Sequence, residues 1–284
     1  MTSEVPAAIA RHVAAWDGGE PAVPRHAATV ILLRDTPSGD GVEAYLLRRV
    51  SAMAAFGGMT VFPGGGVDPA DIDSANLPWS GPDADAWSGP LSAPPDLARG
   101  LVCAAVRETF EESGVLLAGA TAGDVVADTS APEWETAREA LEARELSLST
   151  LLTERGLVLR ADLLRPWAHW ITPVQEKRRF DTRFFVAALP SGQRTRDVAG
   201  EAERVAWARP ADALVSLERG EIVMVPPTAI TLRELARHRS VADVLAAADG
   251  RQIEPVTPRL VPDGDSIRFL LPTDPGYDAP DGRA

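Results

Sequence analysis

The chain has 284 residues, 45% of them apolar and 24% charged, which are the proportions of an ordinary globular protein. Its net charge of −13 argues against non-specific binding to nucleic acid, which depends on basic groups that neutralise phosphates. No stretch approaches the roughly 18 consecutive apolar residues of a membrane-spanning helix.

The single cysteine, Cys103, excludes an intrachain disulfide and a multi-cysteine zinc site. Its apolar neighbours indicate a buried small side chain. The N-terminal residues lack the basic start and apolar run of a secretory signal. We therefore expect a cytoplasmic protein with no nucleic-acid partner and no membrane partner.

The first part of the chain has the pattern of a hairpin. An arm, residues 1–24, precedes the apolar, β-branched run 27–33, which predicts a buried strand. A short glycine-containing loop leads to a second strand at 42–48. A third short strand at 59–62 is ended by a proline and three glycines.

The next stretch, 72–97, is rich in proline and has no hydrophobic period, which predicts an irregular loop over the surface. Its two tryptophans, Trp79 and Trp87, either pin this loop to the body of the protein or form a contact surface. In the second case they would suit a homodimer.

The remainder alternates helical and strand patterns without a regular βαβ rhythm, which predicts an α+β or α/β/α layered fold. The expected helices are 96–113, with Gly114 as its stop, 132–145, 148–155, 210–217 and 227–247. The expected strands are 167–172, 180–189, 203–207 and 267–271.

Three acidic residues carry the clearest chemical signal. Glu108, Glu111 and Glu112 lie three and four positions apart, so one face of a helix presents all three carboxylates. Such crowding is unfavourable unless a hard cation such as Mg²⁺ binds the oxygens. Arg107 can hold a carboxylate in orientation. The alternative is a solvated acidic face that Arg107 balances.

The glycine run upstream favours the metal site. Gly64, Gly65 and Gly66 allow the backbone to approach a ligand closely and expose its amides and carbonyls. Beside the carboxylate helix, this loop could supply a carbonyl ligand and room for a diphosphate.

Together, the segments 62–71 (FPGGGVDPAD) and 107–115 (RETFEESGV) resemble the Nudix box, G-x5-E-x7-R-E-U-x-E-E-x-G-U, where U is bulky and apolar. Gly65 fits the opening glycine, and Asp71 stands at the first acidic position in place of glutamate. Thr109 replaces an apolar residue. The whole stretch 72–106 separates the two pieces where the family has seven residues.

A split box of this kind resembles the coenzyme A diphosphatase branch of the Nudix hydrolases, as do the segments 170–174 (WITPV) and 178–185 (RRFDTRFF). The resemblance implies an α+β fold, a Nudix-type α/β/α sandwich with a mixed central sheet. A single domain would span 25–284, with an insertion at about 72–98 and a helical C-terminal extension at about 210–250.

The resemblance also implies Mg²⁺-dependent hydrolysis of a pyrophosphate linkage, with Mn²⁺ as a substitute. The metal ligands would be Glu108, Glu111 and Glu112 with a carbonyl near Gly64 or Gly65, and Glu108 would be the general base. Arg107 would orient the carboxylates. Many members carry a later carboxylate, for which Glu201 and Glu203 are candidates, although a solvated acidic turn is the alternative for each.

The substrate is less well defined by the sequence. Arginine suits phosphate oxygens, and the candidates are Arg48, Arg49, Arg178, Arg179 and Arg183. For each of them an ordinary surface position is the alternative.

Four aromatic residues could form a base-stacking platform, but we expect them in the core: Trp167, Trp170, Phe180 and Phe184. We expect a small nucleotide-linked substrate, with coenzyme A or acyl-coenzyme A first. The alternatives are ADP-ribose, a dinucleotide or a nucleoside triphosphate, or a non-catalytic nucleotide-binding module.

Overall fold

The structure of the chain is a computed structural model that describes residues 13, 16, 18–49, 57–74, 77–196, 202–263 and 266–279, with the backbone alone for 202–204 and 266. The strands are β1 (Arg25–Asp35), β2 (Val42–Arg49), β3 (Thr60–Val61), β4 (Gly64–Gly66), β5 (Trp79–Ser80), β6 (Ala118–Gly119), β7 (Val158–Arg160), β8 (Arg165–Ile171), β9 (Phe180–Ala188), β10 (Ala202–Ala208), β11 (Pro255–Val256), β12 (Arg259–Asp263) and β13 (Ser266–Leu270). The helices are α2 (Pro69–Ile72), α3 (Ala84–Leu91), α4 (Pro95–Ser113), α5 (Pro132–Glu142), α6 (Leu148–Glu154), α7 (Pro210–Glu218), α8 (Pro226–Leu235) and α9 (Val241–Ala248).

Strand β1 is the centre of a mixed sheet. It pairs antiparallel with β2 and β4 and parallel with β9, and the strand order is β10-β2-β1-β9-β8-β11, with β3 beside β2. The apolar run of β1 is buried almost throughout, as expected for a strand with helices on both faces. The predicted hairpin of β1 and β2 is confirmed.

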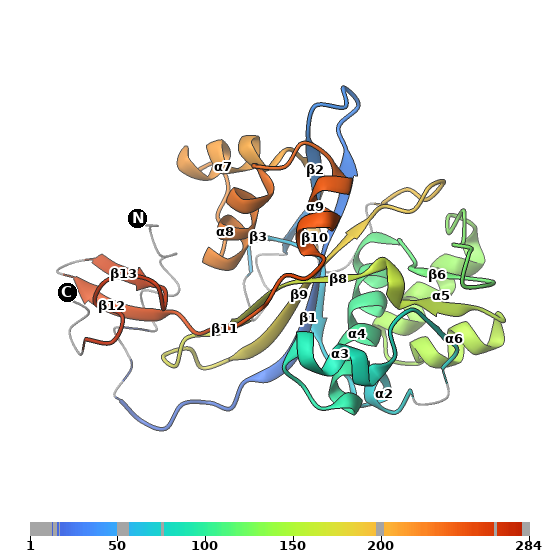
Figure 1. The fold of residues 1–284 in the computed structure, drawn as a ribbon, viewed down its shortest axis with the longest axis horizontal. Coiled ribbons are helices and arrows are strands. Elements are labelled where there is room, and N and C mark those ends of the chain that lie inside the picture. The colour runs from blue at the N-terminus through green and yellow to red at the C-terminus, as the bar shows by residue number, and fades with distance from the viewer. Residues whose placement is uncertain are drawn as a thin grey trace.

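Helices cover both faces of this sheet (Figure 1). On β1, Val30 and Leu32 belong to a core shared with α3 to α6, whereas Ile31 and Leu33 belong to a second core shared with α7 to α9. Successive strand residues point to opposite faces, so this alternation gives a sandwich of helix, sheet and helix. The expected α+β fold is confirmed.

The C-terminal helices are an integral layer of the sandwich and do not form an appendage. Their buried residues, including Ala229, Leu232 and Val244, pack against the sheet. The single helix expected at 227–247 is wrong, because two helices occupy this stretch. The second one starts at Val241, directly after Ser240, whose side chain accepts a hydrogen bond from the amide of Asp243 and caps α9.

The insertion is more ordered than its proline content predicts. Asp83 caps helix α3 by accepting a hydrogen bond from the amide of Ala86. Trp87 is only 4% exposed and meets Phe185 of β9 edge to face, with ring centroids 5.9 Å apart. Leu91, one helical turn later, is fully buried. The expectation of an irregular surface loop is therefore wrong, because an apolar pair at i and i+4 gives α3 a buried face.

Both tryptophans of the insertion hold it to the body of the protein. Trp79 packs against the first core and lies under the guanidinium of Arg99, 4.9 Å from its ring centroid. The burial of Trp87 leaves it no surface for a second copy of the chain. A homodimer remains a prediction.

The chain after α9 adds elements at one end of the sheet. Strand β11 pairs in parallel with β8, and β12 and β13 form an antiparallel hairpin that lies beyond the sheet (Figure 1). The strand expected at 267–271 is confirmed as β13, whereas β12 was not expected. In the part of the chain that the structure describes, none of the helices is both long and apolar enough to cross a bilayer.

Candidate active site

Helix α4 positions the three glutamates. It starts at Pro95, one residue before the expected start, and it ends where Gly114 adopts a left-handed conformation. The side chains of Glu108, Glu111 and Glu112 are 13%, 10% and 8% exposed. The helix therefore holds three carboxylates in a largely buried place, which a merely solvated acidic face would not require.

Arg107 joins both pieces of the split motif. Its guanidinium donates to Asp71 at 2.9 Å, to Glu108 at 2.8 Å, to Glu111 at 3.1 Å and to the carbonyl of Gly66 at 2.8 Å. This network brings the start of the insertion back to helix α4. These contacts are compatible with the predicted role of Arg107 in orienting the carboxylates, which stays a prediction.

Burial and charge act against each other in this network. Burial raises the pKa of Asp71 in spite of the neighbouring guanidinium, and it raises the pKa of Glu111 in the same way. Burial alone would lower the pKa of Arg107, but Glu108, Asp71 and Glu111 raise it. Arg107 is therefore a permanent cation that compensates the carboxylates.

The glycine run forms strand β4, which the sequence did not predict. The amide of Gly64 donates to Glu112 at 2.7 Å. A Cβ atom on Gly65 would stand 2.5 Å from Oε1 of Glu108, so only glycine lets the backbone lie against this carboxylate. The glycines thus bring backbone and carboxylate helix into direct contact.

A cavity of about 340 Å³ opens beside these groups. Its polar lining includes Arg49, Gly64, Gly65, Gly66, Glu108, Arg144 and Glu176. Its apolar part is lined by Trp170, Phe180, Phe184, Pro226, Leu260 and Phe269, among others. Carboxylate, backbone and arginine groups thus adjoin an apolar wall in one cavity, which is typical of small-molecule sites.

The predicted phosphate-binding arginines lie in different places. Arg49 lines the cavity, with its Nη1 atom 3.3 Å from Oε1 of Glu112. Arg48 is exposed and is not part of the lining. Arg179 donates to the carbonyls of Ala22 and of Thr172, a lining residue, but is not itself among the lining residues, so its assignment to the site stays a prediction.

Two further arginine candidates also lie outside the cavity. Arg183 is buried and donates to the carbonyl of Leu91 at 3.0 Å, so it anchors the insertion, while Arg178 is exposed. The side chains of the predicted Glu201 and Glu203 fall outside the described residues. Strand β10 has an irregular register between Ala202 and Arg204, beside Arg48 and Arg49 of β2.

Several residues of the site were missed. Arg144 follows α5 with a positive φ of 61°, carries an exposed side chain 3.3 Å from Asp68, and lines the cavity. Trp170 and Phe184 are buried in the second core as expected, but the sequence did not show that these two residues and the half-buried Phe180 also line the cavity. The signal available was the alternation on β9, where Phe180, Thr182 and Phe184 share one face.

The residues present fit a hard cation in their chemistry. Glu108, Glu111 and Glu112 offer carboxylate oxygens, and the absence of a Cβ on Gly65 leaves room beside Glu108. Among the described residues, no group of three or more acidic, histidine or cysteine side chains is arranged so that it could hold a metal ion. Their oxygens face Arg107 on one side and the amide of Gly64 on the other.

Comparisons with known proteins agree with this geometry. The family model of the NUDT19 Nudix domain matches residues 83–237. The acyl-coenzyme A diphosphatase NUDT19 of Homo sapiens is 27% identical over 278 residues, covering 85% of this chain and 74% of that protein. The protein of the same name from Gallus gallus is 28% identical over 307 residues, covering 89% and 79%.

A solved structure shares the fold. The crystal structure of a Nudix hydrolase from Alicyclobacillus acidocaldarius superposes with a TM-score of 0.68 at 29% identity and covers 79% of this chain and 96% of that chain. The family match covers the carboxylate helix, and Arg107 ties that helix to the glycine strand and Asp71 of the split box. The chain therefore belongs to the NUDT19 family of Nudix hydrolases.

Proposed function

We propose that this chain hydrolyses the diphosphate linkage of coenzyme A or acyl-coenzyme A in a reaction that requires Mg²⁺ or Mn²⁺. The observation that carries the proposal is the cavity in which Glu108 and the glycine strand adjoin an apolar wall. A diphosphate joined to an uncharged chain has the same division into polar and apolar parts. The two relatives named acyl-coenzyme A diphosphatase support this substrate class.

The reaction adds water across a phosphoric anhydride. Water attacks one phosphorus atom, the bond from that phosphorus to the bridging oxygen breaks, and the products are 4′-phosphopantetheine, acylated or free, and 3′,5′-ADP. Glu108, Glu111 and Glu112 would hold the cation. When bound, the cation supplies charge that offsets the diphosphate and lowers the pKa of a water molecule.

The protein's own groups have separate roles in this reaction. Glu108 would accept the proton of the attacking water, and Arg107 holds Glu108 and Glu111 in place. Arg49 and Arg144, which line the cavity, would bind the negatively charged oxygens of the diphosphate and would not take part in proton transfer. Retention of all three glutamates supports an enzyme over a module that only binds nucleotides.

The test is a hydrolysis screen of coenzyme A, acyl-coenzyme A, ADP-ribose, NADH and nucleoside triphosphates, with products resolved by mass. Each substrate is assayed with Mg²⁺, with Mn²⁺, and after chelation followed by restoration of the metal. We expect fastest release of 4′-phosphopantetheine or its acyl form together with 3′,5′-ADP, and loss of activity on chelation. Faster release of AMP from ADP-ribose or NADH would overturn the substrate, and no cleavage of any compound would favour the binding module.

A further inference from the structure

The apolar part of the cavity is completed by the C-terminal hairpin. Leu260 of β12 and Phe269 of β13 are cross-strand partners, and both line the cavity together with Pro258. This hairpin begins after the end of the family match at residue 237. The hairpin is therefore a part of the site that lies outside the matched Nudix domain.

A row of paired residues leads across the sheet from the glycine strand to the base of the hairpin. Gly66 pairs with Ala27, Ala27 with Thr182, Thr182 with Trp170, and Trp170 with Val256. Four inter-strand steps span about 19 Å. This distance is much longer than a diphosphate group, so a substrate whose diphosphate lies at β4 needs an extended chain to reach the hairpin.

The lining at the far end of the row suits a hydrocarbon. Among the described lining residues the charged ones are Arg49, Glu108, Arg144 and Glu176. Neither the hairpin nor the start of α8 adds a charge, because the contributions of α8 and the residue before it are Val225, Pro226, Pro227 and Thr228. One carboxylate, Glu176, borders this end of the cavity, since its neighbour Gln175 donates to the carbonyl of Leu260. A mainly apolar wall favours alkyl groups over phosphate or sugar.

The hairpin is tied to the β8–β9 loop and braced by the chain that flanks it. Gln175 of the loop between β8 and β9 donates to the carbonyl of Leu260 at 3.2 Å. The hydroxyl of Tyr277 donates to the carbonyl of Thr257 at 2.7 Å, and Arg259 donates to the carbonyl of Tyr277. Leu260 is only 3% exposed. These contacts compensate for the low stability of an isolated two-stranded hairpin.

We infer that Leu260 and Phe269 form the subsite for the acyl chain and select substrates by the length of that chain. This inference rests on the proposed function, since the diphosphate of the same substrate must lie beside Glu108. The chain then runs across β1, β9 and β8 and ends against the hairpin. Chain-length preference is accordingly a property of the C-terminal hairpin and not of the Nudix box.

The test compares kcat/KM for dodecanoyl-coenzyme A with kcat/KM for free coenzyme A in the full chain. In Phe269→Ala we expect the ratio of the two constants to fall roughly tenfold or more, as when apolar contacts in a pocket are lost. In Phe269→Trp the larger ring should shift the preferred acyl group to a shorter chain. The series from acetyl to dodecanoyl measures that shift.

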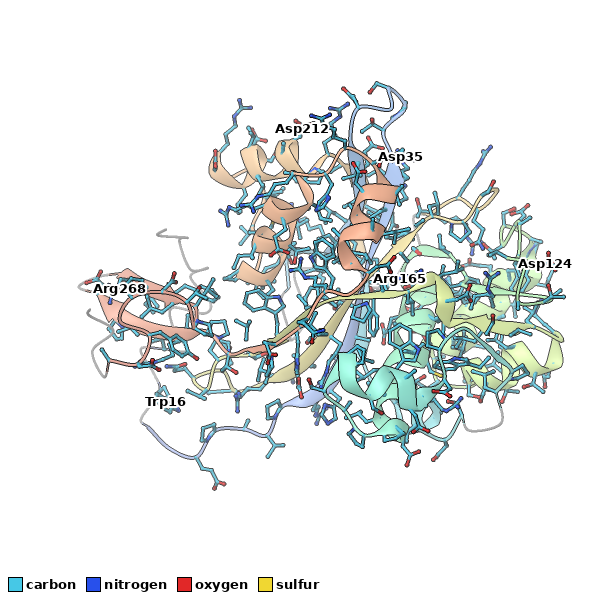
Figure 2. All side chains as sticks on the ribbon, viewed as in Figure 1. Trp16, Asp35, Asp124, Arg165, Asp212 and Arg268 are labelled. Atoms are coloured by element: carbon cyan, nitrogen blue, oxygen red, sulfur yellow. The ribbon has the colours of Figure 1, made fainter. Side chains whose placement is uncertain are left out.

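The matched control is Arg268→Ala. Arg268 lies on the same strand, pairs with Val261 on the other face of the hairpin, and is not among the cavity-lining residues. Figure 2 shows it on the hairpin, at the end of the molecule away from Asp124. Its substitution should leave the ratio within twofold of wild type, and circular dichroism and thermal unfolding check that each variant is folded.

The outcomes separate this inference from the proposed function. If wild type cleaves both compounds and Phe269→Ala leaves the ratio unchanged, or if Arg268→Ala lowers it equally, the acyl subsite is wrong and the diphosphatase stands. If wild type cleaves neither compound, the proposed function fails and the acyl subsite fails with it.

Discussion

Glu112 connects the carboxylate helix to two residues that line the cavity, Gly64 and Arg49. It accepts a hydrogen bond from the amide of Gly64 and pairs with Arg49. A glutamine at this position can still accept from the amide, but it lacks the charge that a cation requires. Replacement of Glu112 by glutamine therefore tests the charge of the carboxylate while the hydrogen bond to Gly64 is kept.

We predict that Glu112→Gln lowers kcat by roughly 10²–10³-fold, the range for loss of one electrostatic group in a site. The melting temperature should change little, because the hydrogen bond to Gly64 is retained. Metal-dependent hydrolysis and thermal unfolding of the same preparation measure both effects. Near-wild-type turnover would remove Glu112 from the metal site.

Gly65 offers a second test at the level of one atom. A methyl group there meets the carboxylate of Glu108 at 2.5 Å, whereas a methyl group on Gly66 has nothing within 4 Å. We predict that Gly65→Ala displaces Glu108 and lowers kcat by about 10²-fold, as small misplacements of catalytic groups do. The control, Gly66→Ala, should keep most of the activity. Equal losses in steady-state assays of the two variants would contradict the role of Gly65.

At the scale of elements, the insertion behaves as part of the core. Helix α3 buries Trp87 and Leu91 against the sheet, and Arg183 holds the carbonyl of Leu91. The two pieces of the split motif are thus joined by packed structure and not by a free loop. Deletion of α3 would expose apolar surface on α4 and β9.

We predict that Trp87→Ala lowers the free energy of unfolding by about 3–5 kcal/mol, the usual cost of truncating a buried aromatic side chain. Trp16→Ala is a control of the same residue type. Trp16 is 39% exposed and lies away from the insertion (Figure 2), so its loss should change the stability by no more than about 0.5 kcal/mol. Urea denaturation measures the free energy of unfolding of both variants. Similar small effects in the two would show that the insertion contributes no more to stability than a surface loop.

At the scale of the whole molecule, a charged cluster connects the sheet to the insertion. Asp181 of β9 lies 2.5 Å from Nε2 of His169 on β8, 2.6 Å from Arg183 and 3.3 Å from Nδ1 of His26 on β1. Burial alone would raise the pKa of Asp181, but the hydrogen bond from His169 and the charge of Arg183 lower it to about 2. The ionised carboxylate therefore stabilises the folded state.

This cluster gives a prediction for acid stability. Because the pKa of Asp181 in the folded protein is below its ordinary value of 3.8, its contribution is complete above about pH 4 and is lost as the pH falls towards 2. The contribution is roughly 1–2 kcal/mol after allowance for solvent screening. Unfolding of wild type and Asp181→Asn at several pH values should show a difference that shrinks over this interval. A difference independent of pH would contradict the assignment.

Much of the fold and the centre of the site could be predicted from the sequence. The acidic face of α4 follows from helix geometry over a few residues, and the box pairs it with the glycine run. The run 27–33 predicts the central strand, because its β-branched and apolar residues favour a buried strand over a helix. These inferences depend on neighbours along the chain, so the sequence contains all of their information.

The positions of the arginines and the cavity walls depend on contacts that are distant in sequence. Arg49 and Arg179 look alike in the sequence, but only Arg49 lines the cavity. Phe184 belongs to the second core as expected, but only the strand order and the packing of the chain show that its face of β9, which also carries Phe180, borders the cavity as well.

The family, the carboxylate helix and the central strands follow from the sequence alone, because periodicity and motif spacing are local properties. The packing of the insertion into the core, the closure of the second face by α7 to α9 and the completion of the cavity by the hairpin emerge only in the folded chain. The physical reason is that the hydrophobic effect is not directional, so an apolar side chain can be buried against any apolar surface. Which surface each one meets is therefore decided by the packing of the whole chain.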